Sequence, residues 1–141
     1  MDNHGTLSGF LTGKIGIAVA AMALIGIASS MLATSNRFTE RQELDRVADA
    51  IADAIKSADG FPGEVELRRQ LSVNGLQLEV SLTGQWQDNL QRIRIRVASK
   101  IGIEKLLVVQ TAVNGGNFRL LVKNPVEIVV RKTEGIEIWL I

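Results

Sequence analysis

The feature that most constrains this chain is an uncharged stretch of twenty residues, from Ile15 to Thr34. It consists of Ile, Ala, Val, Met, Leu, Gly, Ser and Thr. With a rise of about 1.5 Å per residue, a helix of this length spans the ~30 Å hydrocarbon core of a bilayer. The rest of the 141-residue chain is too small to wrap a helix that is apolar on every side. We therefore expect a retained membrane helix, in preference to a cleaved signal peptide or a buried soluble helix.

Small residues recur in this stretch at four-residue spacing. Gly16 and Ala20 form one such pair, and Gly26 and Ser30 form another. In lipid, burial of apolar area does not drive helices together, so small residues matter because they let two backbones approach closely. We expect these four residues to form a helix-packing face through which copies of the chain make a homo-oligomer in the membrane.

A second helical segment, residues 35–60, is predicted directly after the apolar stretch. The chain contains neither Gly nor Pro from Ile27 to Asp59, and Gly60 can cap a helix that ends there. Apolar residues recur at three- and four-residue spacing, which predicts one amphipathic helix. These residues are Leu44, Val47, Ala48, Ile51, Ala52, Ile55 and Ala58. A break at Ser35-Asn36, near the membrane surface, is the alternative to one continuous helix.

Residues 64–141 show the two-residue period of antiparallel strands. Hairpin turns are predicted at Asn74-Gly75 and at 114–117, and a further turn is predicted at 133–135. Residues 83–89 are expected to be a loop that carries Trp86. The apolar run Leu106–Val113 predicts a strand that is buried on both faces. Six or seven short strands indicate an antiparallel β-sandwich or a small barrel, and hence an α+β fold with a long N-terminal helix followed by a β-sandwich.

The composition argues against several classes of function. Sixteen Lys and Arg against fifteen Asp and Glu give a net charge of +1, and this near balance gives no electrostatic case for nucleic acid, which calls for a clustered excess of Lys and Arg. The absence of cysteine excludes disulfides and thiolate metal sites. The single histidine, His4, lies in a polar N-terminal tail, which is a poor place to hold catalytic geometry. We therefore expect no enzyme, no catalytic residue and no cofactor.

Three arginines, Arg92, Arg94 and Arg96, alternate with apolar residues and so share one face of a predicted strand. As a surface patch they would suit an anionic surface such as phospholipid headgroups or an acidic glycan. In the favoured and simpler interpretation this is a solvated strand face, whose arginines pair with carboxylates on neighbouring strands: Glu64, Glu66 or Glu79.

Asp45, Asp49 and Asp53 lie on one face of the predicted amphipathic helix. Like charges at this spacing repel slightly, and the three could hold a cation loosely. Nearby basic residues can neutralise them instead, so we expect no metal site. These residues are Arg41, Arg46 and Lys56.

The chain also has a recognisable order of parts. A polar leader (1–14), an apolar helix (15–34), an Ala-rich amphipathic helix (35–60), a Gly60-Phe61-Pro62-Gly63 turn and a β-domain (64–141) follow one another. In this order the chain resembles the archaeal type IV pilin-like and archaellin-like subunits. The resemblance implies a surface filament or pseudopilus, in which bundled N-terminal helices form the core and the β-domains face outward. Gly9 and Gly13 are candidate leader junctions.

The plan is also similar to single-pass accessory proteins of the archaellum motor. In that alternative the chain is a membrane anchor, and its β-sandwich binds another cell-surface, secretion or motility component. It predicts that the isolated domain 64–141 binds tightly and that the chain does not self-assemble. Either resemblance implies other filament or surface-layer proteins as partners. Either one also implies that the β-domain lies outside the cytoplasmic membrane. The positive-inside rule instead predicts a cytoplasmic β-domain, because one lysine, Lys14, precedes the apolar stretch and three arginines follow it: Arg37, Arg41 and Arg46.

Overall fold

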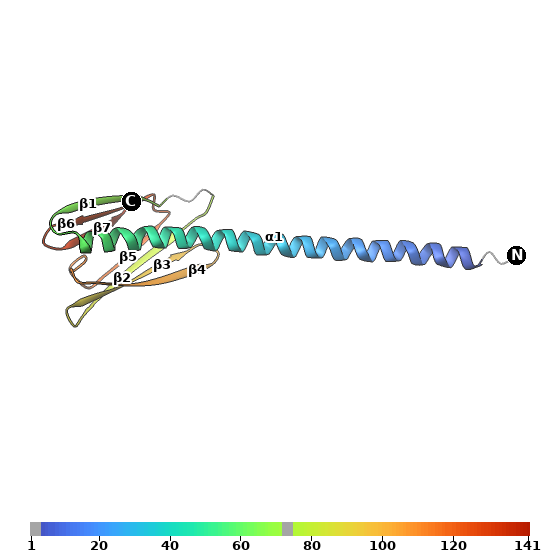
Figure 1. Cartoon of the computed structure of the whole chain (residues 1–141), viewed down its shortest axis with the longest axis horizontal. Coiled ribbons are helices and arrows are strands. Elements are labelled where there is room, and N and C mark those ends of the chain that lie inside the picture. The colour runs from blue at the N-terminus through green and yellow to red at the C-terminus, as the bar shows by residue number, and fades with distance from the viewer. Residues whose placement is uncertain (1–3, 72–74) are drawn as a thin grey trace. The chain divides into compact units, whose positions relative to one another are not determined.

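The computed structural model describes residues 4–71 and 75–141, with side chains from Gly13 onward. One long helix, α1 (His4–Gly60), is followed by antiparallel sheets (Figure 1), so the predicted α+β class is confirmed. The strands are β1 (Val65–Gln70), β2 (Glu79–Gln87), β3 (Leu90–Ala98), β4 (Gly102–Val109), β5 (Phe118–Lys123), β6 (Glu127–Lys132) and β7 (Ile136–Leu140).

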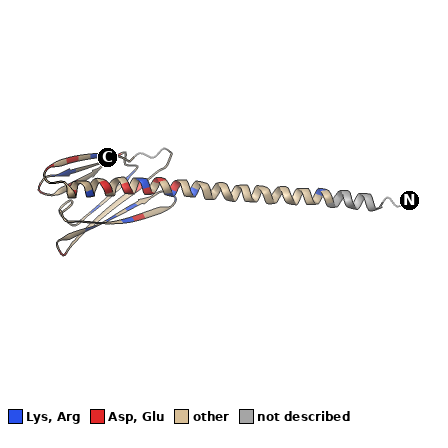
Figure 2. Ribbon diagram, in the orientation of Figure 1, with Lys and Arg blue, Asp and Glu red and all other residues tan. Residues whose placement is uncertain are grey.

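The chain divides into two compact units, residues 1–39 and 40–141. In the first unit, α1 runs through Ser35-Asn36 without the break that was considered there. Neither residue removes a backbone donor as proline would, and the Thr39 hydroxyl donates to the Ser35 carbonyl at 3.0 Å within the helix. Figure 2 shows a long tan stretch of helix without charged residues in this unit, while most of the charged residues lie in the second unit.

In the second unit, the C-terminal part of α1 contributes to one hydrophobic core together with both sheets. At about 100° per residue, its buried positions cover an arc of about 160°. Figure 1 shows the three-stranded sheet on one side of this part of the helix and the four-stranded sheet on the other. The buried helix residues are the seven of the predicted stripe and Ala54: Leu44, Val47, Ala48, Ile51, Ala52, Ala54, Ile55 and Ala58.

The strands form two antiparallel sheets. One has the order β1-β6-β7 and the other has the order β4-β3-β2-β5. The predicted turn at 133–135 is confirmed, because it joins the adjacent strands β6 and β7. The other sheet neighbours include pairs that are distant in sequence, such as β1 with β6 and β2 with β5.

Two predicted hairpins are wrong. The segment around Gly75 joins strands of different sheets, because β1 pairs with β6 whereas β2 pairs with β3 and β5. Asn74 of that predicted turn lies outside the described residues. Residues 114–117 join β4 to β5, which are the two edge strands of the four-stranded sheet. The turn residues are present in both segments, but the pairing of distant strands decides where each turn leads.

The predicted loop at 83–89 is also wrong. Strand β2 continues to Gln87, and its last residues pair with the start of β3, with Trp86 opposite Gln91. The hairpin turns at Asp88 and Asn89, whose φ angles of 53° and 62° are typical of a type I′ turn. Asp and Asn tolerate this left-handed conformation better than other non-glycine residues.

The apolar run that begins at Leu106 is not buried on both faces. Strand β4 ends at Val109, and its side chains alternate. Leu107 and Val109 are in the core, whereas Leu106 and Val108 are 66% and 51% exposed. The prediction was wrong because only one face of β4 packs against the core, and the other face stays exposed.

Candidate functional site

The four predicted helix-packing residues lie in the first unit, on the unbroken helix. At about 100° per residue, Gly16, Ala20, Gly26 and Ser30 fall within one arc of about 120°. A Cβ atom added at Gly16 or Gly26 would meet no atom within 4 Å, so this face is open. Ala23 falls inside the same arc between the two predicted pairs, together with the larger residues Val19 and Ile27.

Two of the three hydroxyl groups in residues 15–34 bond to backbone carbonyls within the helix. Ser30 donates to the Ile27 carbonyl at 2.8 Å, and Thr34 donates to the Ser30 carbonyl at 2.9 Å. An unsatisfied polar group in hydrocarbon costs several kcal/mol, so these bonds make the segment compatible with lipid. By length and composition, α1 is the one described helix that can cross a membrane.

The second candidate surface is the outer face of the four-stranded sheet. Arg92, Arg94 and Arg96 all point outward from β3, while the residues between them are buried. Arg94 pairs with Glu104 of β4, with 3.1 Å between its Nε atom and the carboxylate. This partner is not one of the three carboxylates that the sequence suggested. Glu66 instead binds arginines of the other sheet.

Sequence reasoning missed two further cations of this face. Arg119 and Lys123 of β5 are exposed and alternate with partly buried residues. They join the face because β5 pairs with β2, which places Arg119 opposite Thr83 and Lys123 opposite Glu79. No local signal in the sequence indicates this long-range pairing. We call the five residues the cationic face: Arg92, Arg94, Arg96, Arg119 and Lys123.

On the outer face of the three-stranded sheet, the arginines are paired with carboxylates. Arg131 binds Glu66 at 2.7 Å and lies over the ring of Trp139, 5.5 Å from its centroid. Arg68 binds Glu66 at 3.0 Å and Glu127 at 3.8 Å. The hydrogen bonds from Arg131 and Arg68 lower the pKa of Glu66. Both arginines of this outer face are therefore held in one network of ion pairs with Glu66 and Glu127, and Glu137 of β7 is outside it.

The aspartates of the helix have a counter-ion that the sequence did not reveal. Lys105 of β4 donates to Asp49 and lies 3.7 Å from Asp45. The hydrogen bond to Asp49 is the main reason that the pKa of Lys105 is raised. Arg46, one of the expected partners, binds Glu43 instead. The described residues contain no group of three His, Asp or Glu that could hold a metal ion.

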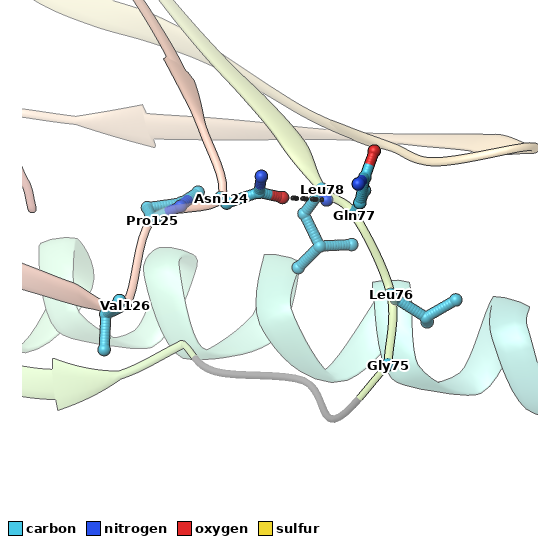
Figure 3. A pocket seen from close by; sticks show the side chains of 7 residues that line it. All are labelled: Gly75, Leu76, Gln77, Leu78, Asn124, Pro125 and Val126. Carbon is cyan, nitrogen blue, oxygen red and sulfur yellow. Dashed lines mark hydrogen bonds between the residues drawn. The ribbon is translucent and has the colours of Figure 1, made fainter.

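A pocket of about 420 Å³ lies between the start of β2 and the turn before β6 (Figure 3). None of its seven lining residues has a titratable or nucleophilic side chain. Its one asparagine, Asn124, is already committed, because its Oδ1 atom accepts the backbone N–H of Leu78 at 2.7 Å. This pocket offers no acid, base or nucleophile, and the side chain of His4 is outside the described part of the chain.

Comparison of the chain with protein-family models, with curated proteins and with solved structures finds no match.

Proposed function

We propose that this chain is a structural, non-catalytic subunit that self-associates through its N-terminal helix, in a membrane or in the core of a surface filament or pseudopilus. The observation that carries this proposal is the exposure of the apolar segment. Between Ile15 and Leu32, nine large apolar side chains are each 53–72% exposed. Burying them in lipid or against other helices contributes on the order of 10 kcal/mol. The segment therefore needs an apolar environment that the rest of the chain does not supply.

The small-residue face supports self-association in addition to simple anchoring. Lipid covers any apolar helix equally well, so an anchor alone does not require Gly, Ala and Ser at four-residue spacing on one side. The larger Val19 and Ile27 share that side and can pack around the close approach that the small residues allow. The open space at Gly16 and Gly26 is available for the backbone of a neighbouring copy. We place the β-domain outside the cytoplasmic membrane, as in the pilin-like plan. Digestion of the β-domain by protease added to intact cells tests that placement, and protection would contradict it.

The test replaces the glycines of this face by a bulky residue. We expect Gly16→Leu and Gly26→Leu to weaken oligomer formation about tenfold or more, because leucine holds two backbones apart. The measurement is sedimentation equilibrium of the full chain in a nonionic detergent.

Ala21→Leu and Ala28→Leu are the matched controls, because they make a similar change on the opposite side of the helix. They should leave the oligomer intact. Persistence of the oligomer in both glycine variants would contradict the proposed packing face.

A second candidate is a single-pass anchor whose β-domain binds another surface, secretion or motility component. The cationic face favours it, since most of its charges have no counter-ion in the described part of the chain. The two candidates differ in the oligomeric state that they predict for the full chain in detergent. The anchor predicts a monomer, whereas the self-associating subunit predicts an oligomer.

A further inference from the structure

The cationic face differs from the outer face of the three-stranded sheet in how few of its arginines are paired. Its five cations share the face with two carboxylates, Glu79 and Glu104. Within the described residues, Arg94 is the one member that has a carboxylate within 4.0 Å. The three-stranded sheet, in contrast, pairs both arginines of its outer face, Arg68 and Arg131. The cationic face therefore retains guanidinium groups that can accept an external anion.

The pairing of β3, β2 and β5 arranges the cations in two rows, one on β3 and one on β5, on either side of β2. Thr83 of β2 is opposite Arg94 on one side and opposite Arg119 on the other. With about 4.8 Å between neighbouring strands, the two rows of cations lie roughly 10 Å apart, with β2 between them. Ser81 and Thr83 form the floor of a hollow of about 240 Å³, which is also lined by arginines of both rows and by Glu104, the partner of Arg94. An anion over this floor can meet arginines from both sides and hydroxyl donors from below.

We propose that the cationic face binds an acidic polypeptide, in the form of an extended segment with carboxylates on alternate residues. The arginines of β3 occupy alternate positions of a strand, so they recur about every 6.8 Å. An extended segment with Asp or Glu at every second residue repeats its carboxylates at the same distance. Arginine and carboxylate match in geometry as well as in charge, because the planar guanidinium can donate two parallel hydrogen bonds.

Two features of this face, its exposed apolar residues and the regular spacing of its arginines, favour a protein over a nucleic acid or a membrane. Leu90, Leu106 and Val108 are 41%, 66% and 51% exposed beside the arginines. A polypeptide can cover them with its own apolar side chains, whereas a phosphodiester backbone cannot. The outward positions of these four strands carry no aromatic ring on which a base could stack. Lipid headgroups have no fixed repeat to match the alternate-residue spacing of the arginine row, whereas an extended polypeptide has one.

The experiment measures binding of a short peptide in which Glu alternates with Val to the full chain in nonionic detergent. We expect binding that weakens as salt is added. The variant Arg92→Gln/Arg96→Gln/Arg119→Gln should bind about tenfold less tightly or worse. A peptide with Gln in place of Glu should not bind.

A matched variant removes the same number of exposed cations elsewhere, as Arg41→Gln/Lys56→Gln/Arg69→Gln. It should bind the acidic peptide within about twofold of the unchanged chain. Equal losses in the two triple variants, or no binding of the acidic peptide at low salt, would overturn the proposal. So would binding of phosphatidylserine vesicles or duplex DNA through the three arginines when the acidic peptide does not bind.

This inference is independent of self-association through α1. The variant at Arg92, Arg96 and Arg119 should form the same oligomer as the unchanged chain. Failure of the peptide experiment and failure of the glycine experiment are therefore distinguishable.

Discussion

Gln91 is fully buried on β3, and its side-chain amide binds the loop that follows β4. Its Oε1 atom accepts the backbone N–H of Val113 at 2.5 Å, and its Nε2 atom donates to the Val113 carbonyl at 3.0 Å and to the Gly116 carbonyl. One side chain thus replaces the backbone partners that this loop lacks. No buried side-chain polar atom in the described residues is left without a hydrogen bond.

We predict that Gln91→Leu lowers the free energy of unfolding by about 3 kcal/mol, because it leaves buried backbone groups of Val113 and Gly116 without partners. The measurement is urea unfolding of the full chain in nonionic detergent. Gln85→Leu is the control: Gln85 is exposed on β2, and its replacement should change stability by less than about 0.5 kcal/mol. Equal stability of the two variants would show that the amide of Gln91 is dispensable.

At the scale of elements, Asp59 ties the end of α1 to the segment after β4. Its carboxylate accepts the backbone N–H groups of Gln110 at 3.1 Å and Thr111 at 2.9 Å. Lys132 of β6 donates to the carbonyls of Asp59 at 2.9 Å and Phe61 at 2.7 Å. Burial is the largest single influence and raises the pKa of Asp59. The hydrogen bonds from Thr111 and Gln110, with the charge of Lys132, together outweigh it, so the pKa lies below its ordinary value of 3.8.

A lowered pKa in the folded state predicts how this tie depends on pH. The ionised carboxylate stabilises the folded chain above the ordinary pKa of 3.8, and this contribution is lost as pH falls through the lower folded value. We expect the unchanged chain to be more stable than Asp59→Asn at pH 7 and to lose that advantage under acid conditions below 3.8. Chemical unfolding of both proteins across this range checks the prediction. A stability difference that does not change with pH would contradict it.

At the scale of the whole molecule, the hydrophobic core belongs to one of the two units. Every residue of the core in the described part of the chain lies at Leu44 or later, inside the unit 40–141. The helix residues of that unit are as deeply buried as those of the strands, with Leu44, Ile51 and Ile55 all fully buried. The C-terminal part of α1 is therefore a structural component of the β-domain as well as a connection to the apolar segment.

We predict that a fragment of residues 40–141 folds without detergent and unfolds cooperatively. A fragment of residues 64–141 should not fold, because it lacks the eight buried helix residues and exposes the core of both sheets. Thermal unfolding followed by circular dichroism compares the two. A cooperative transition in the shorter fragment would show that the helix is dispensable for the β-domain.

The sequence by itself determined the kinds of element and much of where they lie. The apolar segment, the amphipathic helix with its Ala-rich stripe and most strands were all predictable, because each depends on local hydrophobic periodicity. The outward row of Arg92, Arg94 and Arg96 was predictable for the same reason. The helix-packing face of Gly16, Ala20, Gly26 and Ser30 also follows from spacing alone, although its role remains a proposal.

Only the tertiary structure decided which elements meet. Turn residues such as Asn114 and Gly115 mark a change of direction, but the strand that follows pairs according to contacts made far along the chain. Ion pairing cannot be predicted from the sequence either, because a lysine or arginine with a carboxylate partner looks the same in sequence as one without. Lys105 neutralises Asp49 and Arg119 joins the cationic face because long-range pairing brings them there, and no local pattern encodes that pairing.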